Sequence, residues 1–422
     1  LERLRSECPP IPEPWPRPAL DTLVALLGAG PGAIAVLESL DQCGLLVRLL
    51  PEWSRVRSKP QRNSYHRFTV DRHLVEAAVA AAGLTRRVAR PDLLLLGAFL
   101  HDIGKGWPGD HTSAGMTVVA DMGPRLGLPP EDVATLVAMV RHHLLLPDAA
   151  TRRDLTDPAT ARAVADEVGS AQVLELLHAL TEADSAATGP AAWSAWKATL
   201  IAELVGRTSA LLSGVAAPPA RPLTTSQLEL VATGTLALHV DGDEVTVVAP
   251  DRPGLLSVST GVLALHRLDV RAATASSHGR MAVTVFQVSP RFGSPPDWSL
   301  VRDDLRHALD GLLPLRERLA AREAAYSGRL GHAPAPPAVR LVDDASDSST
   351  VVEVRAADAM GVLHRITHVL DECGLDVRTA HISTLGAEVV DAFYVVGPDG
   401  RKLTDTALRE RVCAGVLAAL TT

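Results

Sequence analysis

An adjacent His-Asp pair, His101 and Asp102, is the feature of this 422-residue chain that best predicts chemistry. It ends an apolar run and is followed by Ile, Gly and Lys105. His73 lies 28 residues earlier (101 − 73), and Asp184 lies downstream in Thr-Glu-Ala-Asp-Ser. We expect three helices to bring these imidazole and carboxylate groups to one metal ion. The structural alternative, an N-cap aspartate after a buried helix, does not explain the partner residues.

Further histidines predict a second ion. His111 follows the pair closely, while His142 and His143 are adjacent, so one helix cannot aim both at the same point. We expect His143 to face the site. Isolated histidines of a helical domain usually lie at its surface, which is the alternative for His111 and His143. Mixed imidazole and carboxylate ligands suit manganese, iron, magnesium or zinc and do not choose among them.

The elements that must position these residues are helical. From residue 19 to 206 apolar residues recur three and four positions apart, as in 132–143 and 171–183, and β-branched runs are scarce. This pattern predicts one all-α domain. Residues 1–18 are proline-rich and are expected to be extended, and residues 207–234 are predicted to be a linker because they hold Ser, Thr, Pro and Gly.

A tandem repeat follows. Asp-Arg-Pro-Gly-Leu-Leu from Asp251 aligns with Asp-Ala-Met-Gly-Val-Leu from Asp358 at an offset of 107 (358 − 251), and Leu-Asp-Val-Arg recurs at the same offset. We predict two α+β, ferredoxin-like β-α-β-β-α-β units over 235–344 and 347–422. The second copy ends in a helix, so its last strand must be absent or supplied from elsewhere.

Each copy has a loop that could hold a ligand. The loop residues are Asp251, Gly254 and Leu255 in the first copy, and Asp358, Gly361 and Val362 in the second. We expect the aspartates to cap free N–H groups, the glycines to leave room, and the helix N-terminus to attract a carboxylate such as that of an amino acid. A tight strand-to-helix turn without a ligand is the alternative.

Composition narrows the class of protein. Apolar residues make up 47%, which suits packed domains, and the net charge of −8 argues against a nucleic-acid surface. The apolar run 93–100 is too short to cross a membrane, and the N-terminus lacks a signal-peptide core. Four scattered cysteines favour the cytoplasm. The first residue, Leu1, hints at a fragment of a longer protein.

These motifs resemble the HD phosphohydrolase superfamily, whose pattern is H…HD…D. Within it the chain resembles the bifunctional uridylyltransferase/uridylyl-removing enzymes of PII nitrogen signalling. The resemblance rests on the stretches ending at His73, Gly106, His111, Pro158 and Asp184, and it covers about residue 20 to the end. The repeats resemble ACT regulatory domains, for which Asp-Arg-Pro-Gly-Leu-Leu is the usual loop.

The resemblance implies a metal-dependent hydrolase that removes UMP, or AMP in some lineages, from a tyrosine of the nucleotidylated PII protein. It implies manganese or magnesium as the ion, with iron or zinc as alternatives, and glutamine as the ACT effector. Asp102 and Lys105 would be catalytic. Arg152 and Arg153 would hold the nucleotide phosphate or the acidic partner, although a loop salt bridge is equally compatible. No membrane partner is expected, and ACT sheet edges could pair into a homo-oligomer.

The family's full-length enzymes begin with a nucleotidyltransferase domain, and we find no motif for it in this chain. Two other readings stay open. An HD hydrolase of a free nucleotide such as (p)ppGpp also pairs HD with ACT, but that family has a synthetase region, a TGS domain and one ACT domain. A non-catalytic amino-acid sensor would have lost metal ligands, whereas every expected ligand position is filled.

Overall fold

The chain divides into two compact units in the computed structural model. The helical unit comprises residues 1–150 and 161–218, and the sheet unit comprises 151–160 and 219–422. Cys8 lies outside the described residues, and Cys43, Cys373 and Cys413 are free thiols. The structure describes residues 7, 9–61, 67–189, 192–215, 223–291, 293–325, 336–385 and 388–421, with the backbone alone at 323–325, 383–385 and 388.

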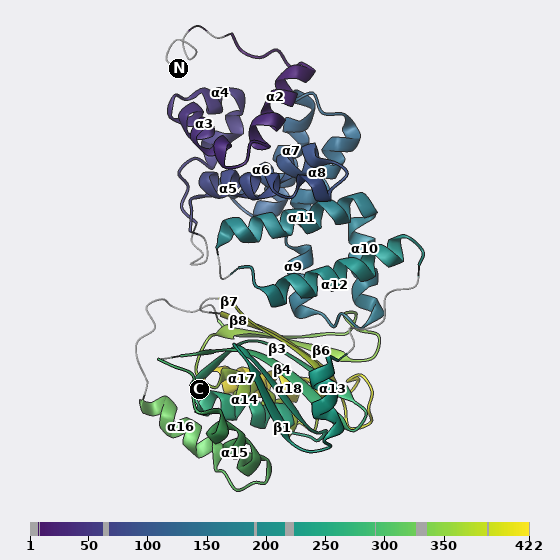
Figure 1. The fold of residues 1–422 in the computed structure, drawn as a ribbon. Coiled ribbons are helices and arrows are strands. Elements are labelled where there is room, and N and C mark those ends of the chain that lie inside the picture. The colour runs from purple at the N-terminus through teal and green to yellow at the C-terminus, as the bar shows by residue number, and fades with distance from the viewer. Residues whose placement is uncertain are drawn as a thin grey trace. The chain divides into compact units, whose positions relative to one another are not determined.

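The first part of the chain is all-α, as the periodicity predicts (Figure 1). Its α-helices are α2 (Arg17–Leu27), α3 (Pro31–Gln42), α4 (Leu45–Leu49), α5 (Val70–Ala82), α6 (Pro91–Leu100), α7 (His111–Arg125), α8 (Pro130–His142), α9 (Leu145–Arg152), α10 (Pro158–Val168), α11 (Ala171–Thr188) and α12 (Ala195–Leu212). Short 3-10 turns are η1 (Pro51–Arg55), η2 (Thr85–Arg87) and η3 (Ile103–Gly106).

Helix α6 forms the centre of the helical core. Every residue from Leu93 to Leu100 is buried, because α2, α5, α8 and α11 all pack against this helix. An α-helix that is apolar on all sides needs such neighbours to remove it from water. The helix starts with Pro91 at its first position and ends at His101. Because the apolar run is buried, the His-Asp pair that follows it also lies in the interior.

Within the described ranges no single helix is long and apolar enough to cross a membrane. Helices α2 and α3 pass that test only together, by length and composition, and they are bent by 120° at the break between them.

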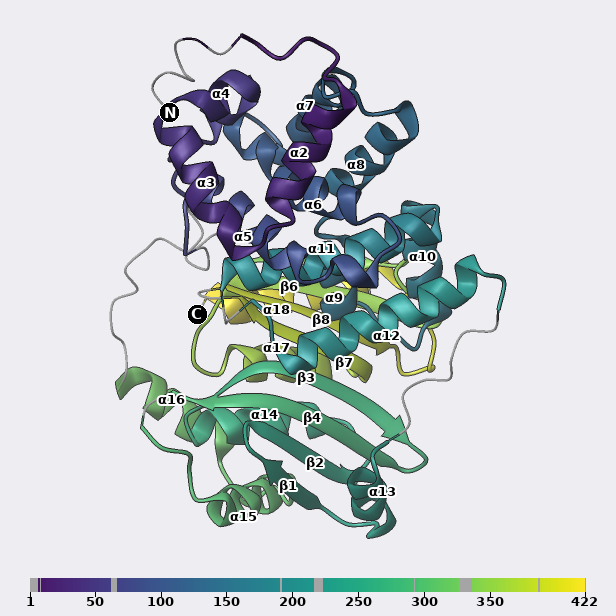
Figure 2. The same ribbon diagram turned by 45° about the horizontal axis from the view of Figure 1, so that its top comes forward.

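The sheet unit is built on one eight-stranded antiparallel sheet (Figure 2). Its order is β1-β2-β4-β3-β7-β8-β6-β5. The strands are β1 (Ala237–Asp241), β2 (Glu244–Pro250), β3 (Leu268–His278), β4 (Met281–Pro290), β5 (Ala338–Val342), β6 (Thr350–Ala357), β7 (Asp376–Leu385) and β8 (Glu388–Val396). The helices are α13 (Thr225–Ala232), α14 (Leu255–Leu265), α15 (Trp298–Leu309), α16 (Leu315–Ala325), α17 (Val362–Glu372) and α18 (Thr406–Thr421).

The two predicted α+β copies are confirmed, with one change in strand order. Each repeat runs β-β-α-β-β before its C-terminal helices, as β1-β2-α14-β3-β4 and β5-β6-α17-β7-β8. The fourth strand of each repeat thus comes first rather than last, since β1 pairs with β2 and β5 pairs with β6. β1 lies inside the predicted first unit, whereas β5 precedes the predicted start of the second at residue 347. A tight hairpin at Asp241–Glu244 makes this pairing local in the first repeat.

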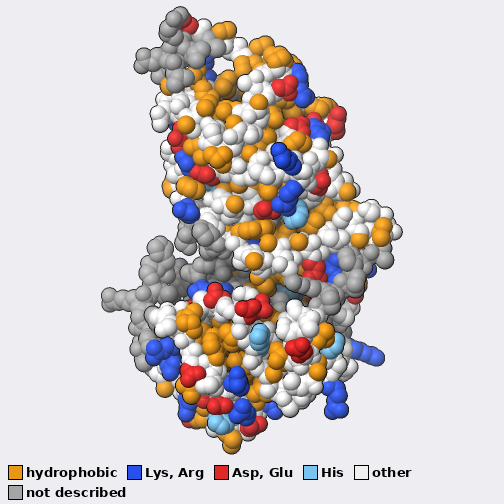
Figure 3. Space-filling view, in the orientation of Figure 1, with side chains coloured by type: hydrophobic (Ala, Val, Ile, Leu, Met, Phe, Trp, Pro, Cys, Tyr) orange, Lys and Arg blue, Asp and Glu red, His pale blue; other side chains and the backbone are white. Residues whose placement is uncertain are grey.

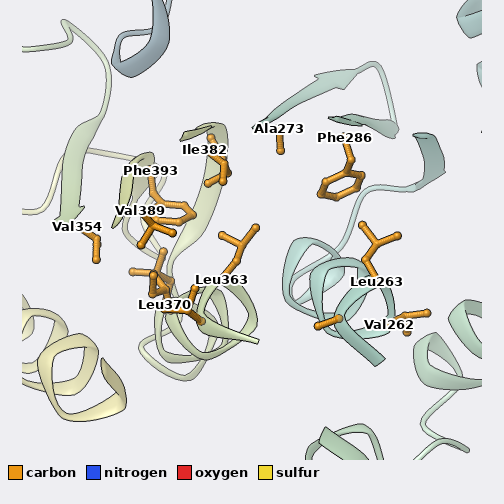
Figure 4. Packing of buried hydrophobic residues seen from close by; sticks show 14 of the residues in the cluster. Val262, Leu263, Ala273, Phe286, Val354, Leu363, Leu370, Ile382, Val389 and Phe393 are labelled. Carbon is orange, nitrogen blue, oxygen red and sulfur yellow. The ribbon is translucent and has the colours of Figure 1, made fainter. Parts of the chain in front are cut away.

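The repeats meet around a pseudo-two-fold axis. Strand β3 pairs with β7, and Ala273 opposite Ile382 is the counterpart of Ala275 opposite Ala380. Beneath the sheet α14 packs on α17, where the hydroxyls of Thr260 and Thr367 lie 3.4 Å apart. Figure 4 shows side chains of both repeats in this apolar layer. One shared core therefore ties the two copies into a single unit.

The predicted linker 207–234 holds helical structure at both ends. Helix α12 continues to Leu212, and α13 begins with a capping box at Thr224. Leu230 and Val231 of α13 pack on the outer face of the first repeat's sheet. On the face shown in Figure 3, acidic and basic side chains are interspersed, in keeping with the small net charge.

Candidate metal centre and effector cavities

Helix ends carry the predicted metal ligands of the helical unit. His73 lies in the first turn of α5, and His101 and Asp102 occupy the end of α6 and the residue before η3. Asp184 lies in the last turns of α11, which packs against both α5 and α6. Residues separated by 111 positions in sequence are thus brought together because three helices share one core.

One cluster consists of His73, His101 and Asp184. The two imidazole Nε2 atoms lie 3.3 Å apart, and the Asp184 carboxylate lies 3.0 Å from His73 Nε2 and 3.4 Å from His101 Nε2. Both histidines are about 1% exposed. Three potential ligand atoms converge here, whereas the sequence predicts Asp102 in the same set.

A second cluster consists of Asp102, His111 and His143. Asp102 Oδ1 lies 3.7 Å from His143 Nε2 and 3.9 Å from His111 Nε2. The other oxygen, Oδ2, faces His101 Nε2 at 3.5 Å and His73 Nε2 at 3.7 Å. Asp102 therefore stands between the two clusters with one oxygen toward each.

The backbone sets the orientation of two imidazoles. His101 Nδ1 lies 2.9 Å from the Ala98 carbonyl, and His143 Nδ1 lies 2.7 Å from the Val140 carbonyl. A carbonyl only accepts, so each Nδ1 carries the proton and donates it. Each Nε2 then presents a lone pair to the cluster, which is how metal-binding histidines are usually held.

Electrostatics favour a cation here. Burial opposes charge on His101, but the Asp102 and Asp184 carboxylates outweigh it and raise the His101 pKa. Burial alone would raise the pKa of Asp102, yet His101, Lys105 and His143 lower it. The pKa of Asp184 is also held well below its usual range, since His101 and His73 outweigh its burial. Both carboxylates therefore remain ionised at neutral pH.

The donor set fits a divalent metal ion. Asp102 Oδ1 is buried and accepts no hydrogen bond from the described residues. An ionised oxygen left without a partner in the interior is costly, and a bound cation would satisfy it. Imidazole nitrogens with carboxylate oxygens form the ligand mixture of many divalent ions. This geometry does not distinguish manganese, magnesium, iron and zinc.

Gly104 explains why the His-Asp pair is followed by glycine. A Cβ at this position would lie 2.0 Å from the His111 carbonyl oxygen and 2.4 Å from the Gly115 nitrogen. No side chain fits in that space, so only glycine lets η3 pack directly on α7. This close approach brings His111 near Asp102.

Lys105 lies at the rim of the clusters, as its place in the motif suggests. Its ammonium lies 2.5 Å from Asp102 Oδ2 and donates to Gln61 Oε1 at 2.8 Å. The side chain keeps 23% of its surface exposed. Sequence reasoning missed Gln61, and a lone glutamine 44 residues before Lys105 gives no signal for that contact.

Other predicted residues lie outside the two clusters. His142 is 3.8 Å from Glu167, so of the adjacent pair it is His143 that meets Asp102. Arg152 is the last residue of α9, and Arg153 follows it. Arg153 lies 3.3 Å from Glu353 on β6, which favours the salt-bridge alternative for that arginine.

Two cavities open where the repeats meet in the sheet unit. They contain about 550 and 410 Å³ of space and are related by the pseudo-two-fold axis. The predicted loop residues line them: Asp251, Gly254 and Leu255 the first, and Asp358, Gly361 and Val362 the second. The opposite wall of each cavity comes from the other repeat, as Asp371 and Asp376 show for the first.

The expected aspartate caps are corrected by the structure. Gly254 and Gly361 are the N-cap residues of α14 and α17, in left-handed conformations with φ of 77° and 72°, and neither helix has a side-chain cap. The Asp251 carboxylate instead accepts a hydrogen bond from Ser277. Helix N–H groups are thus left for a ligand rather than used by the aspartates.

The cavities differ in charge. Each lining includes three aspartates, and the first adds Arg252 and Arg378. The lining of the second includes no arginine. There Asp391 stands where the first cavity has Thr284, and burial together with Asp269 raises the pKa of Asp358. Arginine side chains line only the first cavity, whereas Arg271 and Arg291 act on the aspartates of the second from outside its lining, where both pair with Asp269.

Comparisons with known proteins agree with this architecture. Residues 70–180 match the HD domain model, and residues 345–418 match the model of the ACR family N-terminal ACT domain. The bifunctional uridylyltransferase/uridylyl-removing enzyme of Streptomyces coelicolor is 46% identical over 96% of this chain and 55% of its own length. Its counterparts are 44% identical in Mycobacterium tuberculosis (99% and 54%) and 34% identical in Gluconobacter oxydans (91% and 48%).

The fold and the site thus define an HD-family hydrolase unit joined to two related α+β repeats, the second of which matches an ACT domain. More particularly, the chain is similar to the bifunctional uridylyltransferase/uridylyl-removing enzymes, and the match is consistent with their C-terminal part. The chain spans about half the length of the curated relatives it matches. The resemblance seen in the sequence is confirmed at this level.

Proposed function

We propose that this chain hydrolyses the phosphodiester between a tyrosine of the PII signalling protein and a nucleoside monophosphate, UMP or AMP. The main support for this proposal is the pair of His/Asp clusters, which both face Asp102. The printed name of the relatives, uridylyl-removing, supports the reaction class.

A divalent ion held by either cluster would lower the pKa of a water and polarise phosphoryl oxygens. His73, His101 and Asp184 would hold one ion, and His111 and His143 a second, with Asp102 oriented toward both. Manganese or magnesium is the proposed metal. The buried side chains exclude bulk water behind the reacting phosphate, and the exposed edge at His111 and Lys105 leaves room for a protein substrate.

Proton transfer to the leaving group is a minor requirement. A tyrosine phenol has a pKa of about 10, so phenolate departs without a strong general acid. The Lys105 ammonium would instead offset charge that develops on the phosphoryl oxygens. Asp102 holds that ammonium in place at 2.5 Å.

We propose glutamine as the effector and the first cavity as its principal site. The N-terminus of α14 would receive the ligand carboxylate with help from Arg252 or Arg378, and an aspartate of the lining would receive the ammonium group. Both cavities depend on contact between the repeats, so a ligand there would bias how the repeats meet.

The test supplies the purified chain with nucleotidylated PII protein and Mn²⁺, with and without glutamine. We expect release of nucleoside monophosphate that is lost in the His101→Ala/Asp102→Ala variant. His142→Ala is the matched control, since His142 lies beside His143 but outside both clusters. Hydrolysis of free nucleotides alone would favour the (p)ppGpp-type alternative, and metal or glutamine binding without any hydrolysis would favour a sensor.

A further inference from the structure

The outer faces of the two repeats, opposite α14 and α17, carry different side chains. In the first repeat this face is apolar where Val248, Met281 and Val283 pack against Leu230 and Val231 of α13. In the second repeat it carries an imidazole and a phenol hydroxyl that the first repeat lacks at the positions 107 residues earlier. Thr379, His381 and Tyr394 replace Ala272, Thr274 and Gln287.

A ten-residue segment, Thr151–Thr160, belongs to the sheet unit and contacts this polar face. The Asp154 backbone N–H donates to the Tyr394 hydroxyl at 2.6 Å, and the Asp154 carboxylate accepts from Thr379 at 3.3 Å. Tyr394 is 1% exposed. The contact is thus a buried polar one, formed by both the backbone and the side chain of Asp154.

Asp157 provides a second anchor. Its carboxylate accepts hydrogen bonds from the Ser346 hydroxyl and from the Asp347 backbone N–H, the latter at 3.0 Å. Asp157 and Ser346 are both buried. Arg153 adds its ion pair with Glu353. Three successive parts of the segment are therefore held by β6, β7, β8 and the loop before β6.

The same contact leaves one buried group unsatisfied. His381 is 4% exposed, its ring meets Tyr394 edge-on at 5.9 Å, and neither ring nitrogen makes a hydrogen bond with the described residues. A buried donor without a partner costs about 1–3 kcal/mol. The segment is therefore held by specific hydrogen bonds, but its contact also buries one imidazole without a hydrogen-bond partner. This free-energy cost suits a contact that can be released.

The chain on either side of the segment leads back to the helical unit. Helix α9 ends within the segment at Arg152, and it begins two residues after His143, a proposed metal ligand. Helix α10 leaves the segment at Pro158. A shift of the segment on the sheet would therefore be transmitted by one short helix to His143.

We propose that residues 151–160 form a strap through which the state of the ACT pair controls the His143 side of the metal site. The effect of the strap on hydrolysis rests on the proposed function, whereas the coupling of the segment to residues 140–150 does not. A purely structural role of the segment is the opposing reading.

The mechanical test is amide hydrogen exchange on the full chain, comparing wild type with Tyr394→Phe and Thr379→Val. Loss of one hydrogen bond should speed exchange in 151–160 by on the order of tenfold. The strap predicts faster exchange in residues 140–150 as well. Gln287→Leu, at the position of the first repeat that corresponds to Tyr394, is the control and should change neither region. Faster exchange confined to 151–160, or no change at all, would overturn the proposal.

The activity test measures the ratio of hydrolysis rates with and without glutamine. In both strap variants the ratio should move to about 1, while calorimetry shows unchanged glutamine binding. An unchanged ratio in both variants would also overturn the proposal. If wild type releases no nucleotide, the proposed function fails, and the exchange experiment still decides the strap.

Discussion

The helical unit and the sheet unit build their candidate sites in opposite ways. In the helical unit the ligands lie on or at the ends of α5, α6, α7, α8 and α11, which pack around one core, and most of them are buried. In the sheet unit each cavity takes one wall from each repeat, so neither repeat contains a whole site. The first arrangement holds the donor atoms of each cluster within 4.8 Å of one another, close enough to share a metal ion. The second places its site at a contact whose geometry can respond to a ligand.

If the two units act separately, substitutions at the metal ligands should reduce hydrolysis and leave glutamine binding intact. The largest loss of hydrolysis should come from these ligands. Asp102→Asn removes the charge that serves both clusters. We expect hydrolysis to fall about a thousandfold, more than the 10- to 100-fold typical of residues that only support ligands. Calorimetry should show glutamine binding unchanged. Residual hydrolysis above about a tenth of wild type would remove Asp102 from the mechanism.

Lys105 tests whether charge at the rim assists the reaction. Lys105→Met keeps the stem and deletes the ammonium, and kcat should fall on the order of a hundredfold with little change in metal affinity. Lys105→Arg should recover part of the rate. Equal rates for Lys105→Met and wild type would show that the lysine only pairs with Asp102.

His381 should make the stability of the sheet unit depend on pH. Burial lowers its pKa to about 4, against about 6.5 when unfolded, and Asp154 offsets this only in part. Between these values the unfolded chain binds more protons, so stability is full above pH 6.5 and falls as the pH drops toward 4. His381→Gln should recover about 2 kcal/mol at pH 5.

The measurement is thermal unfolding of both proteins at pH 7 and pH 5. The groups that face the His381 ring are Asp154 on the segment and Tyr394 on β8. His239→Gln, on the exposed face of β1, is the control. If wild type and His381→Gln lose the same stability on acidification, the histidine is not buried against the segment.

The smallest effect should distinguish the two cavities. Gly254→Ala and Gly361→Ala impose the same left-handed strain, about 1–2 kcal/mol. Only at Gly254 does the new Cβ meet a cavity group, Asp371 Oδ2 at 3.0 Å, and nothing lies within 4 Å at Gly361. Glutamine affinity should fall about tenfold in Gly254→Ala and little in Gly361→Ala. The reverse order would move the principal site to the second cavity.

Much of this protein was predictable from residue type and spacing. The His-Asp pair, the flanking histidines and Asp184 carry their own chemistry. Helix geometry predicts that only one of His142 and His143 faces the site, and the structure places His143 near Asp102. The repeat offset of 107 predicted two α+β copies. The caps at Asp251 and Asp358 were predicted wrongly, because a side-chain cap and a left-handed glycine are equally compatible with the same short loop.

By itself, the sequence determined which atoms are available: imidazoles, carboxylates and one lysine around an apolar helix, followed by a duplicated α+β unit. Only the tertiary structure decided that Asp102 faces both clusters, that each repeat has its fourth strand at its start, and that residues 151–160 pack with the sheet unit. Local patterns record what each residue can do. Pairings across 100 or more residues depend on how whole faces fit together, which no short window of sequence contains.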